Sequence, residues 1–279
     1  MDCRNCFPAV CVWRYGEPVL CIESGISERS RRNMKKTFVW AHRGASGYAP
    51  ENTLAAFELA KRQEADGVEL DVQLSKDGEV IVMHDERVDR TCNGTGLVRD
   101  FTLAQLKRLS PDRVMPDYDR GSLGRAEIPT LDEVFELLRG SGMTINVELK
   151  NGIIFYEGLE EKVLNMAAAM GMEDVVIYSS FHHASMVKCK QLNPAAKCGL
   201  LYADGTLFMN EYAKRLGMDY LHPAGYHLQD AGFVEACRRD QVPLHVWTIN
   251  EEEDISRMYA LGVEAVISNY PDRCLALRK

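Results

Sequence analysis

Charged residues, most of them acidic, stand at alternate positions in two short apolar segments of the chain. Glu69 and Asp71 are separated by one leucine, and Glu148 and Lys150 are separated by another. In a strand, this spacing places both members of each pair on the same face. Buried carboxylates are costly without a partner. Three of them on two neighbouring strands therefore predict a cation.

Carboxylate oxygens are ligands for hard ions, with water or substrate completing the shell. We therefore expect Glu69, Asp71 and Glu148 to bind one divalent cation, Mg²⁺ or Ca²⁺. The alternative is that these acids pair with Arg43 and Lys150 in a buried ionic network. Residue spacing leaves both interpretations open.

Two histidines follow other apolar segments of the same kind. His42 and His84 each end such a segment, and imidazoles that titrate near neutral pH suit general acid and base catalysis. Arg43 presents a guanidinium fork that fits phosphate oxygens, although it could also pair with Glu69 or Glu51. A cation, two acid/base groups and two basic side chains favour phosphodiester cleavage over redox or acyl-transfer chemistry.

The elements that must position these residues alternate between strand and helix. Short β-branched or apolar runs predict nine strands: Phe38–Ala41, Gly67–Val72, Val80–Met83, Ile145–Leu149, Val175–Tyr178, Cys198–Tyr202, Tyr220–Leu221, Leu244–Ile249 and Ala265–Ile267. Amphipathic stretches predict helices between most of them: Thr53–Arg62, Leu131–Leu138, Leu159–Met170, Ala184–Gln191, Asn210–Leu216, Phe233–Arg239 and Glu253–Leu261. This alternation predicts an α/β fold, a (β/α)8 TIM barrel whose active site lies where strands run into the following loops.

The predicted barrel is irregular in its first half. Only residues 75–79 join the second and third runs, too few for a helix, and one of the nine runs is surplus to a barrel. Residues 86–130 form a small insertion between the third and fourth runs, with one predicted helix at Thr102–Leu109. Long insertions of this kind usually serve function.

Composition excludes several other classes of protein. The 279 residues carry a net charge of −8, with 46% hydrophobic and 27% charged residues. This balance is typical of a globular protein and argues against a broad nucleic-acid surface. We find no run of about 18 apolar residues that would span a membrane. Serine nucleophile, phosphate-loop and dinucleotide fingerprints are also absent from the sequence.

The first residues differ in character from the rest. Residues 1–36 are expected to form an N-terminal extension, disordered or upstream of a true start at Met34, while 37–279 form the barrel domain. Nine cysteines in no disulfide-like framework indicate a reducing compartment, so we expect a cytoplasmic protein.

An ordered set of motifs resembles the glycerophosphodiester phosphodiesterase family. The motifs span roughly 37–274: His42–Gly47, Pro50–Thr53, Ala56-Phe57, Gly67–Val72, Asp77-Gly78, His84-Asp85, Arg90-Thr91 with Gly94 and Gly96, Ile128–Leu131, Glu148–Lys150, Ser180-Phe181, Trp247–Asn250, Ser268-Asn269 and Pro271-Asp272. The resemblance implies a phospholipase-C-like barrel that hydrolyses glycerophosphodiesters, such as glycerophosphocholine and glycerophosphoethanolamine, to sn-glycerol 3-phosphate and an alcohol.

The resemblance also implies roles for individual residues. It implies a divalent cation on Glu69, Asp71 and Glu148, and His42 and His84 as the acid/base pair. Arg43 and Lys150 become phosphate-side cations, and Trp247 an apolar wall near the substrate. Glu51 is expected close to the site, and Asn52 is expected to cap the first helix.

Several questions stay open at the level of sequence. A lysophospholipase D-type or phosphoinositide-cleaving enzyme would use the same barrel, and a non-catalytic phosphate-binding module is a further alternative. An amidohydrolase-type enzyme would need a His-x-His arrangement that the sequence lacks. The alcohol group, the choice between Mg²⁺ and Ca²⁺, the acid and base roles of the histidines, a cyclic intermediate or direct water attack, and the oligomeric state are not determined.

Overall fold

The computed structural model describes residues 13–14, 17–18 and 36–278. The chain divides into a unit that ends at Lys35 and a unit that begins at Lys36. In the first unit, β1 (Trp13–Arg14) pairs antiparallel with β2 (Glu17–Pro18).

The proposed N-terminal extension lies mostly outside the described residues. Met34, the predicted start, is among the residues that are not described. The extension over 1–36 and the barrel domain over 37–279 therefore remain predictions.

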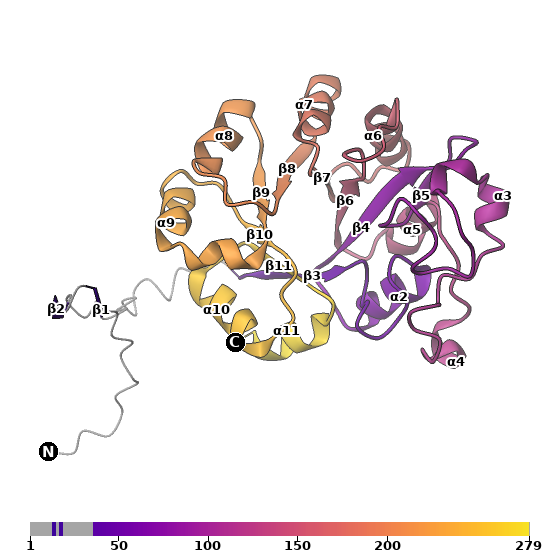
Figure 1. Cartoon of the computed structure of the whole chain (residues 1–279), viewed down its shortest axis with the longest axis horizontal. Coiled ribbons are helices and arrows are strands. Elements are labelled where there is room, and N and C mark those ends of the chain that lie inside the picture. Colours follow the sequence, from indigo (N-terminus) through magenta and orange to yellow (C-terminus); the bar gives the residue numbers. More distant parts are fainter. Residues whose placement is uncertain (1–12, 15–16, 19–35, 279) are drawn as a thin grey trace, which may run out of the picture. The chain divides into compact units, whose positions relative to one another are not determined.

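Eight parallel strands form the sheet of the second unit (Figure 1). Their order is β10-β11-β3-β4-β6-β7-β8-β9. Their bounds are β3 (Phe38–His42), β4 (Gly67–Leu74), β6 (Thr144–Leu149), β7 (Val176–Ser180), β8 (Lys197–Tyr202), β9 (Tyr220–Pro223), β10 (His245–Val246) and β11 (Ala265–Ser268).

The two ends of this sheet approach each other. Parallel bridges join Leu221 to Leu244 and Ala224 to Trp247, which brings β9 next to β10. The backbone N–H of Trp247 donates to the carbonyl oxygen of Pro223 at 3.3 Å. The barrel is therefore nearly closed, and the predicted fold class is confirmed.

Helices encircle the strands (Figure 1). Those predicted between strands are present with ends that shift by at most two residues: α2 (Leu54–Arg62), α5 (Leu131–Leu138), α6 (Leu159–Ala169), α7 (His183–Leu192), α8 (Met209–Leu216), α9 (Ala231–Arg239) and α10 (Glu252–Leu261). The short helices η2 (Gly225–Gln229) and α11 (Pro271–Leu277) were not predicted. Pro271 stands in the first turn of α11, where its missing N–H costs nothing. None of the helices in the described part of the chain combines the length and the apolar character that crossing a bilayer requires.

The surplus run is a strand outside the parallel order. β5 (Val80–Val82) pairs antiparallel with β4, with Val72 opposite Val82. Gly78 has φ +83° in the connecting turn, a conformation that glycine adopts without strain. The insertion consequently follows β4 and its hairpin partner, and β6 is the third barrel strand rather than the fourth.

The insertion has an apolar cluster of its own. It contains the short helices η1 (Val98–Asp100), α3 (Leu103–Leu106) and α4 (Arg120–Leu123). Helix α3 is shorter than predicted, because beyond Leu106 the chain continues as a tight turn in which Leu109 N–H donates to the Leu106 carbonyl. The cluster consists of Ile81, Met83, Val88, Cys92, Val98, Leu106 and Ile128.

Apolar packing between sheet and helices stabilises the barrel. Phe135 on α5 is fully buried in the main core, while Glu136 on the same helix is exposed. Replacing Phe135 by alanine should lower the free energy of unfolding by about 3–5 kcal/mol, because a cavity forms in a packed core. Replacing Glu136 by alanine should change it by less than about 0.5 kcal/mol. Urea unfolding of both variants measures the difference, and equal losses would contradict this account of the core.

Candidate active site

The register of β3, β4 and β6 brings acidic residues together at one end of the barrel. His42 is paired with Glu69, and Asp71 with Glu148. Side chains at paired positions of parallel strands lie on the same face. One carboxylate oxygen each of Glu69, Asp71 and Glu148 lies within 4.8 Å of the others, and all three residues are buried.

Burial and mutual repulsion disfavour ionisation of this cluster. Burial raises the pKa of Glu69, and the charges of Asp71 and Glu148 raise it further. Burial and Asp71 also raise the pKa of Glu148. Burial alone would raise the pKa of Asp71 as well, but Arg43 and other nearby basic groups lower it to about 2. When all three carboxylates are ionised, the cluster therefore holds more negative charge than the neighbouring basic side chains neutralise.

The donor set fits a divalent cation. Oδ1 of Asp71 is buried and has no hydrogen-bond partner, which is costly for a carboxylate oxygen. Around it lie five carboxylates and three basic side chains, so full ionisation with both histidines neutral leaves two negative charges: Glu51, Glu69, Asp71, Asp85 and Glu148 against Arg43, Arg90 and Lys150. A protonated His84 beside Asp85 reduces this excess to one. A dication on the carboxylates would neutralise this excess.

Arg43 reaches the cluster from a strained turn after β3. Its φ is +58°, and the next residue, Gly44, has φ +80°. A Cβ on Gly44 would lie 2.6 Å from the backbone of Ala56, so only glycine fits there. The backbone N–H of Arg43 donates to Oε2 of Glu69 at 3.0 Å. Non-glycine residues with positive φ are often found at functional sites.

The two basic side chains form the ion pairs that the alternative interpretation proposed. Arg43 Nη1 donates to Glu51 Oε1 at 2.9 Å, and Arg43 Nε lies 3.4 Å from Asp71 Oδ2. Lys150 Nζ donates to Glu148 Oε1 at 3.0 Å and lies 4.0 Å from Asp71 Oδ1. These pairs are compatible with a cation, because Asp71 Oδ1 accepts no hydrogen bond.

Asn52 does not cap the first helix, contrary to the prediction. The cap of α2 is Thr53, whose side chain accepts from the Ala56 N–H. Asn52 instead has φ +56° and donates through Nδ2 to Asp71 Oδ2 at 2.8 Å. Asparagine and threonine both suit a cap, and the contact with Asp71, which the sequence does not reveal, decides between them.

His42 ends β3 beside the cluster. Its Nδ1 donates to Oδ1 of Asn269 at 2.7 Å, which leaves Nε2 unprotonated and 4.0 Å from Glu69 Oε2. Burial, together with Arg43, lowers the pKa of His42 to about 4. The ring is therefore neutral near pH 7, with a lone pair on Nε2 that can accept a proton.

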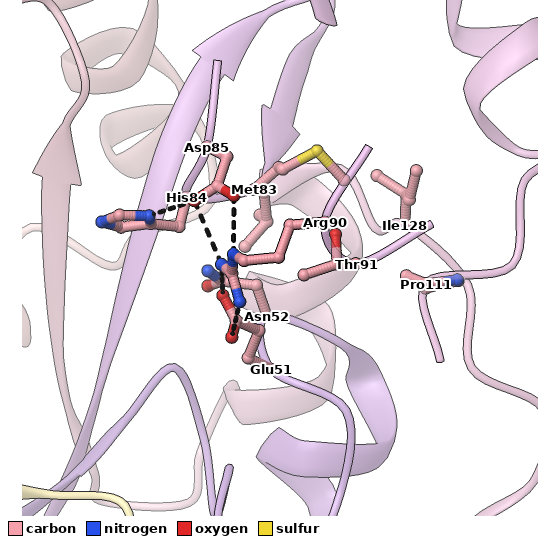
Figure 2. A pocket seen from close by; sticks show the side chains of 10 residues that line it. Glu51, Asn52, Met83, His84, Asp85, Arg90, Thr91, Pro111 and Ile128 are labelled. Carbon is pink, nitrogen blue, oxygen red and sulfur yellow. Dashed lines mark hydrogen bonds and ion pairs between the residues drawn. The ribbon is translucent and has the colours of Figure 1, made fainter. Parts of the chain in front are cut away.

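His84 lies just beyond β5 and is paired with a carboxylate. Its Nδ1 donates to Asp85 Oδ1 at 2.6 Å. The hydrogen bond from His84 lowers the pKa of Asp85, and contacts with Arg90 lower it further. Figure 2 shows the His84 ring on one side of Asp85 and Arg90 on the other. The carboxylate of Asp85 thus holds Nδ1 of His84, so that a proton would be exchanged through Nε2 of the ring.

The described contacts of Trp247 are with other groups than the acidic residues. Its Nε1 donates to the carbonyl oxygen of His222, and its ring meets that of Phe181 edge-on at 5.6 Å between centroids. It packs with the apolar cluster of Trp40, Ile177, Ala265 and Ile267. Its predicted place beside the substrate therefore remains a prediction.

The other histidines have contacts away from the acidic cluster. His222 and His245 are buried and hydrogen-bonded to each other at 2.9 Å. A Cβ on Gly199 would lie 2.3 Å from the His222 ring, so glycine leaves room for this pair. His182 and His183 stand at the start of α7.

Four polar residues of the site were not given a role from the sequence, or were given the wrong one. Asn52 and Asn269 orient groups of the cluster, and Asp85 and Arg90 continue the ion-pair network from His84. The one local signal was that Asp85 immediately follows His84. Arg90 lies five residues after Asp85, whereas the contacts of Asn52 and Asn269 join residues 19 and 227 positions apart.

Comparison with known proteins gives a consistent family match. Residues 42–273 match the model of the Glycerophosphoryl diester phosphodiesterase family. A Glycerophosphodiester phosphodiesterase of Caldanaerobacter subterraneus subsp. tengcongensis is 43% identical over 242 residues, which cover 87% of this chain and 98% of that protein. One of the same name from Bacillus altitudinis is 40% identical over 248 residues, with the same coverage of both chains.

A solved structure is similar over the same part of the chain. It is an Oleispira antarctica phosphodiesterase in complex with the product sn-glycerol-3-phosphate. The TM-score is 0.76 and the sequence identity 32%, and the match covers 87% of this chain and 96% of the other. At 32% identity the two proteins are similar in sequence as well as in fold.

Proposed function

Because the chain belongs to the glycerophosphoryl diester phosphodiesterase family and is an enzyme with glycerophosphodiester phosphodiesterase activity, we propose that it hydrolyses small water-soluble glycerophosphodiesters. Glycerophosphocholine and glycerophosphoethanolamine are the proposed substrates, and sn-glycerol 3-phosphate and an alcohol the products. The observation that carries this proposal is the buried triad of Glu69, Asp71 and Glu148, flanked by two histidines whose Nδ1 atoms are already engaged.

We propose that Glu69, Asp71 and Glu148 hold one divalent cation, Mg²⁺ or Ca²⁺. The unpartnered Asp71 Oδ1 and the uncompensated negative charge support this. Such a cation supplies positive charge that stabilises a phosphate as it becomes five-coordinate. The guanidinium of Arg43 and the ammonium of Lys150 lie beside the triad and add positive charge on the side where the phosphate would bind.

We assign the base to His42 and the acid to His84. Asn269 fixes the Nδ1 proton of His42, so that Nε2 can take the proton of the nucleophile, either the neighbouring glycerol hydroxyl or water. Asp85 orients the His84 ring through Nδ1, and His84 gives a proton to the leaving alkoxide as the phosphorus–oxygen bond breaks. After this step each histidine is in the other's starting state. On the hydroxyl route water then opens the cyclic phosphate with the two roles reversed, and on the water route proton exchange with solvent restores both histidines.

One assay tests the substrate proposal. The full-length protein is stripped of metal, Mg²⁺ or Ca²⁺ is added back, and release of the head-group alcohol is measured with glycerophosphocholine, glycerophosphoethanolamine and a lysophospholipid. For the two water-soluble diesters, sn-glycerol 3-phosphate is measured as the second product. We expect the two water-soluble diesters to be cleaved faster, in agreement with the names of the relatives, which do not favour a lysophospholipase D. Faster cleavage of the lysophospholipid would reverse the substrate assignment, and no release from any diester would refute the proposal.

The protein is also proposed to act in a reducing compartment, the cytoplasm. Five cysteines of the described part carry free thiols in buried positions, where thiols pack as small apolar groups: Cys92, Cys189, Cys198, Cys237 and Cys274.

A further inference from the structure

Arg90 comes from the insertion and reaches two carboxylates of the site. Nε and Nη2 donate to Asp85 at 2.7 and 3.0 Å, and Nη1 and Nη2 donate to Glu51 at 2.8 and 2.6 Å. In Figure 2 the guanidinium lies between these two side chains. The planar fork of arginine makes paired contacts of this kind, which the single ammonium of lysine cannot reproduce.

Each carboxylate held by Arg90 in turn holds a group of the proposed machinery. Oδ1 of Asp85 accepts the Nδ1 proton of His84, and Oε1 of Glu51 accepts a hydrogen bond from Nη1 of Arg43. Arg90 therefore stands one residue away from the proton donor and one residue away from the phosphate-side cation, on two branches of one network.

We propose that Arg90 is a positioning residue that fixes His84 through Asp85 and Arg43 through Glu51. This inference rests on the proposed function of the site. Asp85 and Glu51 sit on separate loops, one after β5 and one before α2, and Arg90 joins them directly. Without the guanidinium, each carboxylate can rotate toward solvent. The side chain bonded to it, His84 or Arg43, can then move as well.

The surrounding insertion holds Arg90 in place. Hydrogen bonds from Arg113 hold the backbone on both sides of it. Arg113 Nη1 donates to the Asp89 carbonyl at 2.6 Å, and the Arg113 N–H donates to the Thr91 carbonyl at 2.9 Å. Val88 and Cys92, on either side, are fully buried in the apolar cluster of the insertion. The insertion thus holds the guanidinium of Arg90 in position at the candidate active site.

Two branches of the network predict two separable kinetic effects. Loss of the Asp85 branch should lower kcat, because His84 is misplaced, and loss of the Glu51 branch should raise KM, because Arg43 is misplaced. Misplacement of groups at a reacting centre costs up to about 10² in rate. Arg90→Ala is therefore expected to lower kcat by about 10–10² and to raise KM.

The control is Arg87→Ala. Arg87 belongs to the same segment and carries the same charge, but its described ion pair is with Asp89. We expect near-normal kcat and KM from this variant. Arg90→Lys, which keeps the charge and loses the fork, is expected to resemble Arg90→Ala, and millimolar guanidinium should restore part of the kcat of Arg90→Ala.

A double-mutant cycle separates positioning from a general loss of structure. In a His84→Ala background, Arg90→Ala should lower kcat no further but should still raise KM. Turnover of the unmodified protein in the same assay establishes that the proposed function holds. The inference is overturned if folded Arg90→Ala, or folded Arg90→Lys where the alanine variant does not fold, keeps normal kcat and KM. It is also overturned if the kcat losses from Arg90→Ala and His84→Ala multiply independently.

Discussion

Replacing His84 with alanine is expected to lower kcat for glycerophosphocholine by about 10²–10⁴. The choline alkoxide is a poor leaving group and needs a proton as the phosphorus–oxygen bond breaks. His84, with Nδ1 bonded to Asp85, is placed to give that proton. Its side chain is partly exposed and lies outside the main core, so the barrel of the variant should stay folded, as circular dichroism would show.

The leaving group separates the role of His84 from that of His42. A p-nitrophenyl glycerophosphodiester has a leaving group that departs without protonation, so the loss caused by His84→Ala should shrink strongly on it. The loss caused by His42→Ala should stay large on both substrates, because a nucleophile must still be deprotonated. His183→Ala, on a histidine of α7 that bonds to the Leu201 carbonyl, is the matched control. Equal losses for both variants on both substrates would contradict the acid and base assignment.

Removal of the divalent cation should abolish turnover and destabilise the protein. Chelation leaves three buried carboxylates close together, with Asp71 Oδ1 unpartnered. Binding to the native state alone stabilises a protein by about 2.7 kcal/mol when the free cation is a hundred times its Kd. We therefore expect Tm to rise when Mg²⁺ or Ca²⁺ is added to stripped protein, and to rise less for Glu148→Gln. Full activity of stripped, metal-free protein would remove the cation from the proposal.

The stabilisation by the cation should grow with pH. The pKa of Glu69 is raised in the folded state by burial and by Asp71 and Glu148, so the cation-free native state binds a proton there that the unfolded chain has lost. Stability of the cation-free protein therefore falls as pH rises above the ordinary glutamate range. A bound dication favours the ionised form and reverses this loss. The difference in Tm with and without cation, measured at about pH 6 and about pH 8, should be larger at the higher pH. A smaller difference in Tm at the higher pH would contradict the proposed effect of the cation on the ionisation of Glu69.

The fold was predictable where the signal was local. Alternation around Glu69 and Asp71 placed both on one face of β4, and the short linker 75–79 indicated that Val80–Val82 could not be reached through a helix. Asp77-Gly78 in this linker predicts a tight turn, but the sequence did not show that the run after it would stay outside the parallel order. That choice depends on pairing with a strand edge and not on the residues of the run alone.

The contacts that orient the site were beyond reach of the sequence. Arg90 and Glu51 are 39 residues apart, and His42 and Asn269 are 227 apart. Only closure of the barrel and folding of the insertion bring them together. The same reason explains the error at Asn52, where a tertiary bond to Asp71 outweighed a local preference for capping.

The proton donor stands where the main core of the barrel meets the smaller apolar cluster of the insertion. His42 ends a barrel strand, whereas His84 follows β5, from which Val80 and Val82 pack in the main core and Ile81 packs in the smaller cluster. Regions with separate packing can open independently of the whole molecule. On gentle heating, this enzyme should accordingly lose turnover several degrees before its barrel melts, and regain it on cooling.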